Sequence, residues 1–138
     1  MRILGLDLGS KTIGVAISDK NEFLASGLTT IRFAQDDYDD GFDQLLELID
    51  EHQIKKIVLG LPKHMNGDIG IRGQLSIDFK ENLENERDVE VVLWDERLTT
   101  VSATNLLLSA DVSRKKRKEV VDKIAAVFIL QGYLDSRK

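Results

Sequence analysis

The sequence predicts an α/β fold in which a mixed five-stranded sheet is covered by helices on both faces. Two observations predict it: short apolar runs alternate with segments of helical periodicity, and a tight Gly-Ser-Lys turn joins the first two runs. Strands joined by a tight turn are antiparallel, whereas strands separated by a helix are normally parallel with right-handed crossovers. With 138 residues, 42% of them hydrophobic, the chain is long enough for one domain over residues 1–138 around a single core.

Five segments are predicted strands. The opening pair, residues 2–8 and 12–18, should form an antiparallel hairpin. The three remaining strands are expected at residues 24–31, 56–61 and 89–94.

Four further segments are predicted helices. Apolar residues recur at three- and four-residue spacing over residues 38–52 and again over residues 71–83, which indicates two amphipathic helices. Two more helices are expected at about residues 99–109 and 118–136. The basic run at residues 114–118 is predicted to separate these last two helices.

The composition excludes several classes of protein. Without cysteine, the chain has neither a disulfide framework nor a thiolate metal site. No apolar stretch is long enough to span a membrane, and the first apolar run is too short for a signal peptide, so a cytoplasmic protein without a membrane partner is expected. The net charge of -5 argues against non-specific coating of nucleic acid, but not against an enzyme that binds it locally.

Asp7 is a carboxylate inside the otherwise apolar first strand. A charged group in a central strand is costly unless it is paired or binds a cation, which indicates a functional role. The alternative is a partly exposed residue near the strand end that caps the following turn.

Asp95 and Glu96 follow the fifth predicted strand directly. Charges at the carboxyl end of a strand lie where open α/β sheets usually place their sites. Either residue can supply a second carboxylate, and Glu96 is the candidate that we select. Alternatively, Glu96 belongs to a helix start beside Thr99 and Thr100, which are good N-caps.

Asp122 lies in the last predicted helix, next to the core-like residues Ala125 and Phe128. The small pair Ala125-Ala126 would let this helix approach the sheet closely and bring Asp122 toward the carboxylates of the strands. Alternatively, Asp122 only complements the positive end of the helix dipole.

Three carboxylates gathered in one place would repel each other, and a hard divalent cation with oxygen ligands relieves that repulsion. Asp7, Glu96 and Asp122 are therefore the predicted catalytic and metal-binding residues, with Mg²⁺ or Mn²⁺ as the cofactor. Two such ions can activate a water, orient a scissile phosphate and stabilise the leaving oxygen.

Five basic residues are predicted to contact nucleic-acid phosphates, because they lie in or beside loops near the strand ends or shortly before Asp122. They are Lys11, Lys63, Arg97, Arg114 and Arg117. The alternative is a solvated charged face, which explains Lys115 and Lys116 equally well.

Four segments match the motifs of a known family. They are Gly5-Leu-Asp7-Leu-Gly9-Ser-Lys-Thr, Val58-Leu-Gly60-Leu-Pro62 with Asn66-Gly67, Asp95-Glu96-Arg97-Leu-Thr99-Thr100, and Asp122-Lys-Ile-Ala125-Ala126. In this order, and over essentially the whole chain, the sequence resembles the YqgF (RuvX) family, whose members are described as Holliday-junction resolvases and as pre-16S ribosomal RNA nucleases.

The resemblance implies a ribonuclease H-like fold, a bacterial cytoplasmic setting and a nuclease that matures the 5′ end of 16S ribosomal RNA. The implied partners are precursor 16S ribosomal RNA or branched DNA, together with ribosomal particles, and the chain would act as a monomer or a homodimer. The family's acidic positions carry over to Asp7, Glu96 and Asp122. In the better-known resolvases the second carboxylate closes the fourth strand, whereas here that strand ends in Gly60-Leu61-Pro62, so Glu96 would supply it from the fifth.

Three alternative functions stay open. A Holliday-junction resolvase in recombination acts on two symmetric strands and so works as a dimer, whereas trimming one RNA end needs only a monomer. A non-catalytic module that binds RNA or the ribosome would keep the same fold. The first hairpin also resembles the phosphate-binding hairpin of actin-like ATPases and sugar kinases, but those proteins need two such domains around the nucleotide.

Overall fold

The structure, a computed structural model, describes residues 1–62, 70–95 and 114–137, and of residues 72 and 114–123 it describes the backbone alone. The strands are β1 (Ile3–Leu8), β2 (Thr12–Ser18), β3 (Ala25–Arg32), β4 (Lys56–Leu61) and β5 (Glu90–Asp95). The helices in this part of the chain are α1 (Tyr38–His52), α2 (Ile71–Glu86) and α4 (Arg114–Ser136). None of these helices is long and apolar enough to cross a membrane.

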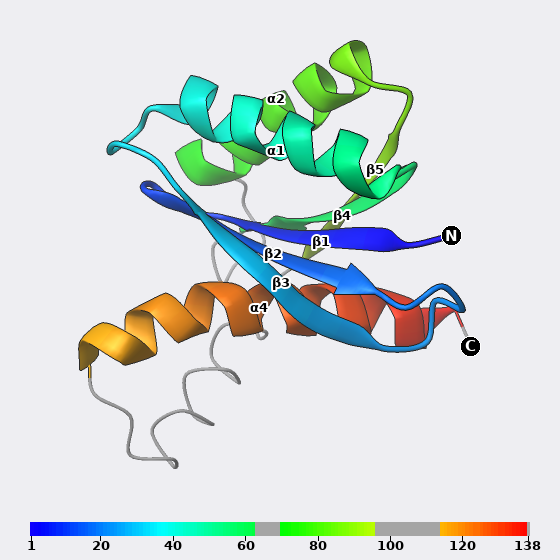
Figure 1. The fold of residues 1–138 in the computed structure, drawn as a ribbon. Coiled ribbons are helices and arrows are strands. Elements are labelled where there is room, and N and C mark those ends of the chain that lie inside the picture. The colour runs from blue at the N-terminus through cyan, green and yellow to red at the C-terminus, as the bar shows by residue number, and fades with distance from the viewer. Residues whose placement is uncertain (63–69, 96–113, 138) are drawn as a thin grey trace.

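The five strands form one mixed sheet in the order β3-β2-β1-β4-β5 (Figure 1). β2 pairs antiparallel with both β1 and β3, while β4 runs parallel to both β1 and β5. β1 is therefore the central strand, with both of its edges paired. The predicted mixed sheet is confirmed, and every predicted strand agrees with the observed bounds to within one residue.

Helices cover both faces of the sheet, as predicted, with α1 and α2 on one face and α4 on the other (Figure 1). Because side chains alternate along a strand, each strand contributes to both layers. Leu4 and Leu6 of β1 enter the larger core, which packs against α1 and α2. Ile3 joins the smaller core, which packs against α4.

α4 lies very close to the central strand, as the pair Ala125-Ala126 predicts. A Cβ on Gly5 would lie 2.6 Å from the Cβ of Leu130 and 2.9 Å from the carbonyl oxygen of Ala126. Both alanines and Leu130 are fully buried. Interiors packed this densely have no room for an extra methyl group, so residue 5 must be glycine for α4 to lie where it does.

Two predictions about α4 are wrong. The basic run at residues 114–118 does not separate two helices but forms the first turns of α4, because arginine and lysine are good helix formers. These turns extend past the strands, where a helix needs no apolar face (Figure 1). Phe128 is not a core residue, because the buried side of α4 follows Ala126, Ile129 and Leu130 and leaves Phe128 37% exposed.

The other predicted helix of this pair, at residues 99–109, lies outside the described residues. In α2 the apolar series is buried only toward its end. Ile71, its first member, is 85% exposed, whereas Phe79 and Leu83 are buried in the larger core. The beginning of α2 therefore contributes little to that core.

Candidate functional site

Asp7 lies in β1 on the face that α4 covers. Ile3 and Gly5 of the same strand contact α4, and residues two apart along a strand share a face, so Asp7 belongs to this face too. The residue is half-buried and is the last but one of the strand. Its neighbour in β2 is Gly14, which has no side chain. The β2 position beside Asp7 therefore carries no side chain.

Gly60 and Trp94 lie in the same row across the sheet as Asp7. Leu6, the residue before Asp7, pairs with Leu59 of β4, so Asp7 lies beside the next residue of β4, Gly60. Gly60 in turn pairs with Trp94 of β5. Gly60 leaves the place beside Asp7 without a side chain. Trp94 is the last residue of this row, because β5 is the last strand in the order of the sheet, and its side chain packs against the smaller core beneath α4. The carboxylate thus lies in a row with glycine on both sides and an indole at the far end.

Asp95 lies on the other face of the sheet. It is the last residue of β5 and is exposed. Leu93 packs against the larger core and Trp94 against the smaller one, so alternation places Asp95 with Leu93, away from Asp7. Of the two carboxylates that the sequence leaves open, Asp95 is therefore on the wrong face to meet Asp7. Glu96 follows β5 in the sequence and lies outside the described residues.

The backbone of α4 carries residue 122 toward the same end of β1 as Asp7. β1 and α4 run in opposite directions (Figure 1), and Ala126 lies over Gly5. From that contact Asp7 is two residues further along the strand, about 7 Å, and residue 122 is one helical turn back along α4, about 6 Å. The two positions therefore move in the same direction by nearly the same distance. The side chain of Asp122 lies outside the described part of the chain.

The turn that follows Asp7 is held on both sides. The amide of Gly9 donates to the carbonyl of Thr12 at 2.7 Å, and a Cβ on Gly9 would lie 3.1 Å from that carbonyl oxygen. The carbonyl of Lys11 accepts from the amide of Phe33 at 2.9 Å, and that of Ser10 accepts from the amide of Asp36 at 2.8 Å. The backbone of the turn is thus tied to the segment after β3, while the Lys11 side chain is exposed at the Asp7 end of the sheet.

The other predicted phosphate contacts are only partly described. Lys63 and Arg97 lie outside the described residues. Arg114 and Arg117 occupy the first turns of α4, three residues apart, so their positions share one side of the helix. The same helix carries residue 122 one to two turns later, which places the basic run and the third candidate carboxylate on one rigid element.

Ion pairs far from Asp7 fix the beginning of β5. Glu84 of α2 accepts a hydrogen bond from Lys80 Nζ at 2.7 Å and another from the amide of Val91 at 3.0 Å. The bond from Lys80 has the larger effect, and both lower the pKa of Glu84. Arg87 makes two bonds to the carboxylate of Asp50, at 2.8 and 3.0 Å, which lowers the pKa of Asp50. Both contacts lie at the amino-terminal end of β5, so they set the strand's position and take no part in the site.

Asp7 provides one feature that a metal site needs, a half-buried carboxylate. Its neighbours in the two adjacent strands are glycines, which carry no side chains. Among the residues that the structure describes, no group of three His, Asp or Glu side chains is placed to hold a metal. Of the predicted set, only Asp7 has a described side chain. The sequence pattern alone does not assign Gly14 and Gly60 to the site, although a glycine inside an apolar strand often marks a close approach or a ligand.

Comparison with known proteins shows a close match over the whole chain. A family model described as "RuvX: Holliday junction resolvase" matches residues 1–136. A protein of Bacillus mycoides (strain KBAB4), named "Putative pre-16S rRNA nuclease", is 58% identical over 137 residues, which is 99% of this chain and 100% of that protein.

Solved structures share the fold at low sequence identity. The structure of T. thermophilus RuvC in complex with a Holliday junction substrate has a TM-score of 0.62 at 13% identity, over 99% of this chain and 96% of that chain. The complex of the Fowlpox virus resolvase with Holliday junction DNA has a TM-score of 0.63 at 12% identity, over 99% of each chain. These resolvases have a ribonuclease H-like fold, so the predicted fold class is confirmed.

Proposed function

The chain belongs to the RuvX family, described as Holliday junction resolvases, and on this premise we propose that it cleaves precursor 16S ribosomal RNA at a site formed by Asp7, Glu96 and Asp122. Its action as a nuclease, a hydrolase of phosphodiester bonds in nucleic acid, follows from the family and is consistent with the fold. The substrate, the site residues and the dependence on metal are what we add.

The observation that carries the proposed site is the place of Asp7 beneath α4. A half-buried carboxylate lies in the central strand, on the face that packs closely against α4, and its neighbours in both adjacent strands are glycines. Carboxylate oxygens are ligands that a hard divalent cation prefers, so Asp7 can provide one side of a cation site here. Residue 122 is carried toward the same end of β1, so a second carboxylate can share that cation.

The donor set suits a hard divalent cation. Carboxylate oxygens are the ligands that Mg²⁺ and Mn²⁺ prefer, and Asp7, Glu96 and Asp122 would hold them. When bound, these ions supply a polarised phosphate oxygen and an activated water. The chain itself supplies position: Asp7 is fixed by strand pairing on both edges of β1, and such fixed geometry accounts for much of the rate enhancement in enzymes.

Glu96 is preferred over Asp95 because of strand alternation. Asp95 shares the face of Leu93, on the side of α1 and α2, and Asp7 is on the side of α4. The preceding residue, Trp94, faces α4, and Glu96 is two positions after it in the sequence. Lys63 and Arg97 remain proposed phosphate contacts, together with Lys11, Arg114 and Arg117.

Precursor 16S ribosomal RNA is proposed because of the relatives. Proteins 57–58% identical over 99% of this chain carry a name that specifies it. The family description and the solved complexes with junction DNA favour the second candidate, resolution of a Holliday junction. The two substrates differ in symmetry, because a junction requires two coordinated cuts and one RNA end requires one.

The test is cleavage of end-labelled precursor 16S RNA and of a four-way DNA junction, side by side, with Mg²⁺ or Mn²⁺. We expect the RNA to be cut only when metal is added. Asp7→Asn should lower the rate at least about 100-fold, because even residues that only support a metal ligand are commonly worth 10- to 100-fold. The control is Asp43→Asn, which removes an exposed carboxylate of α1 on the other face of the sheet and should cleave at the wild-type rate.

Each other outcome decides between the alternatives. Junction cleavage without RNA cleavage would assign the function to recombination. Metal-dependent cleavage that survives in Asp7→Asn would remove Asp7 from the site. The absence of metal-dependent cleavage of either substrate, with retained RNA binding, would favour the non-catalytic module.

A further inference from the structure

The side of α4 that faces β5 carries an aromatic and basic cluster that the proposed site does not use. Trp94 of β5 and Tyr133 of α4 meet edge to face, with ring centroids 6.1 Å apart and planes at 87°. Lys56 Nζ lies 5.9 Å from the centroid of the Tyr133 ring, and the guanidinium carbon of Arg137 lies 5.4 Å from it. We call Trp94, Tyr133, Lys56 and Arg137 the α4 flank.

Trp94 is held flat against the helix backbone. A Cβ on Gly132 would lie 3.3 Å from Trp94 Nε1 and 3.4 to 3.5 Å from two carbons of the indole. Glycine inside a helix is destabilising relative to alanine, so its presence here is explained by the approach of the indole. Trp94 remains half-buried, and its indole N–H donates to no acceptor in the part of the chain that the structure describes. The protein thus orients this ring without using its donor.

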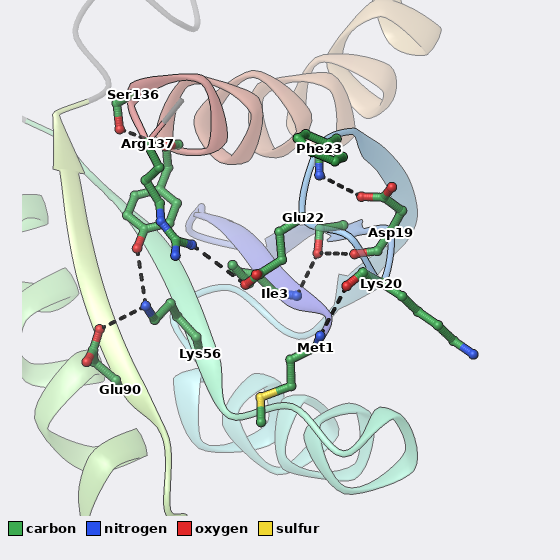
Figure 2. A network of polar contacts seen from close by, with 12 residues as sticks. Met1, Ile3, Asp19, Lys20, Glu22, Phe23, Lys56, Glu90, Ser136 and Arg137 are labelled. Carbon is green, nitrogen blue, oxygen red and sulfur yellow. Dashed lines mark hydrogen bonds and ion pairs between the residues drawn. The ribbon is translucent and has the colours of Figure 1, made fainter.

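The two cations of the flank are held by weak partners (Figure 2). Lys56 Nζ lies 3.5 Å from a carboxylate oxygen of Glu90 and donates to Tyr133 Oη at 3.4 Å, while Arg137 lies 3.6 Å from Glu22. The Glu90 side chain is 64% exposed and that of Arg137 is 43% exposed. Partly exposed pairs with contacts as long as these contribute little to stability, so either cation can exchange its carboxylate for a phosphate.

The flank is continuous with the proposed site. Trp94 lies in the same row of the sheet as Asp7 and comes two residues before Glu96 in the sequence. β5 is the edge strand of the sheet, so no further strand lies beyond it in the described residues. A strand of nucleic acid that leaves Asp7 toward β5 would meet Trp94 first, then Tyr133, and then the two cations.

We propose that the α4 flank binds the single-stranded nucleotides next to the cleavage site, with bases stacked on Trp94 and Tyr133 and phosphates on Lys56 and Arg137. The proposal rests on the proposed nuclease function. Proteins that bind single strands combine aromatic faces, on which bases stack, with cations that follow the backbone. The flank has both, on the face of the sheet that carries Asp7.

The test uses Trp94 as a probe, because it is the only tryptophan of the chain. Ten-nucleotide oligouridylate and oligothymidylate are titrated into the protein in EDTA, so that no cleavage occurs. We expect a saturable change in Trp94 fluorescence. Tyr133→Leu should weaken binding by about 5-fold or more, since stacking of one base is worth at least that factor. Lys56→Ala and Arg137→Ala should each lower the slope of log K against log salt by about 0.7.

Matched variants separate stacking from folding. Phe128→Leu removes a partly exposed aromatic on another side of α4 and should bind like the wild type. Trp94→Phe keeps an aromatic face and Trp94→Leu does not, so with a labelled oligonucleotide only the second should lose affinity. If Trp94→Leu fails to fold, as checked by circular dichroism, the fluorescence of wild type and the Tyr133→Leu variant still decide the proposal.

Two results would overturn the proposal: no binding of either oligonucleotide, or saturable binding of the labelled oligonucleotide without any change in Trp94 fluorescence. Tighter binding of oligouridylate would show that the flank also contacts the 2′-hydroxyl, and equal binding that it contacts bases and phosphates alone. The proposed function fails separately. In that case wild type does not cleave, or Asp7→Asn still does, while the fluorescence response persists.

Discussion

Gly5 of β1 lies against Leu130 of α4 so closely that a Cβ at residue 5 would be 2.6 Å from the Leu130 Cβ. This contact sets the height of α4 above the central strand. Asp7 is two residues further along that strand, and residue 122 is one helical turn from the same contact. The packing of one glycine therefore controls the distance between the backbone of Asp7 and that of residue 122.

Gly5→Ala should lower both stability and activity. The added methyl group meets backbone and buried carbon atoms that cannot move away, and overpacking of this kind costs about 1–3 kcal/mol. Urea denaturation measures the loss, and the cleavage rate of the remaining folded protein should fall because α4 is displaced. Gly27→Ala, at an exposed position of the edge strand β3, is the control. Equal stability of Gly5→Ala and wild type would contradict the close contact.

Glu96→Gln and Asp95→Asn should differ strongly in activity. Alternation along β5 places Asp95 on the face opposite Asp7, so its amide variant should keep cleavage within about 3-fold, whereas loss of a metal ligand should cost about 100-fold or more. Initial rates of RNA cleavage at saturating Mg²⁺ measure both variants. A larger loss in Asp95→Asn than in Glu96→Gln would reverse the assignment.

Glu84 should make stability depend on pH in the acid range. Its pKa is lowered from 4.5 in the folded state by Lys80 and the amide of Val91, so its contribution is complete above about pH 4.5 and is lost as the pH falls through the lowered value. Glu84→Gln should reduce the free energy of unfolding at pH 7 by no more than about 1 kcal/mol, because the pair is partly exposed. The difference from wild type should shrink as urea denaturation is repeated from pH 7 down to pH 3.

The control is Glu81→Gln, which changes an exposed residue of α2. A difference between Glu84→Gln and wild type that grows at low pH would contradict the argument.

Most of the fold could be predicted from the sequence, because its signals are local. Alternating apolar runs fall on the five observed strands, and the helical period from Tyr38 onward coincides with α1. The start of α4 was not predictable in the same way. Its first turns carry five basic residues without an apolar face, and a pattern that depends on burial does not detect a helix that extends past the sheet.

The candidate site was predictable only in part. Asp7 is conspicuous in an apolar strand, and the structure places it on the α4 face of the sheet. The choice between Asp95 and Glu96 needs the strand's alternation relative to both cores, which the sequence does not contain. The contact of Trp94 with Gly132 joins residues 38 positions apart, so no local pattern predicts it.

Lys11→Ala should weaken nucleic-acid binding in a salt-dependent manner. Its backbone is fixed by the bond from Phe33, at the end of the sheet that carries Asp7, and its side chain is exposed. A cation that contacts one phosphate releases about one counterion, so its loss should lower the slope of log K against log salt by about 0.7 for a single strand or 0.9 for a duplex. Lys20→Ala, which removes an exposed lysine from the turn between β2 and β3 at the opposite end of the sheet, should leave the slope unchanged. Anisotropy titrations from 50 to about 200 mM salt compare the two variants, and equal slopes would mean that Lys11 makes no phosphate contact.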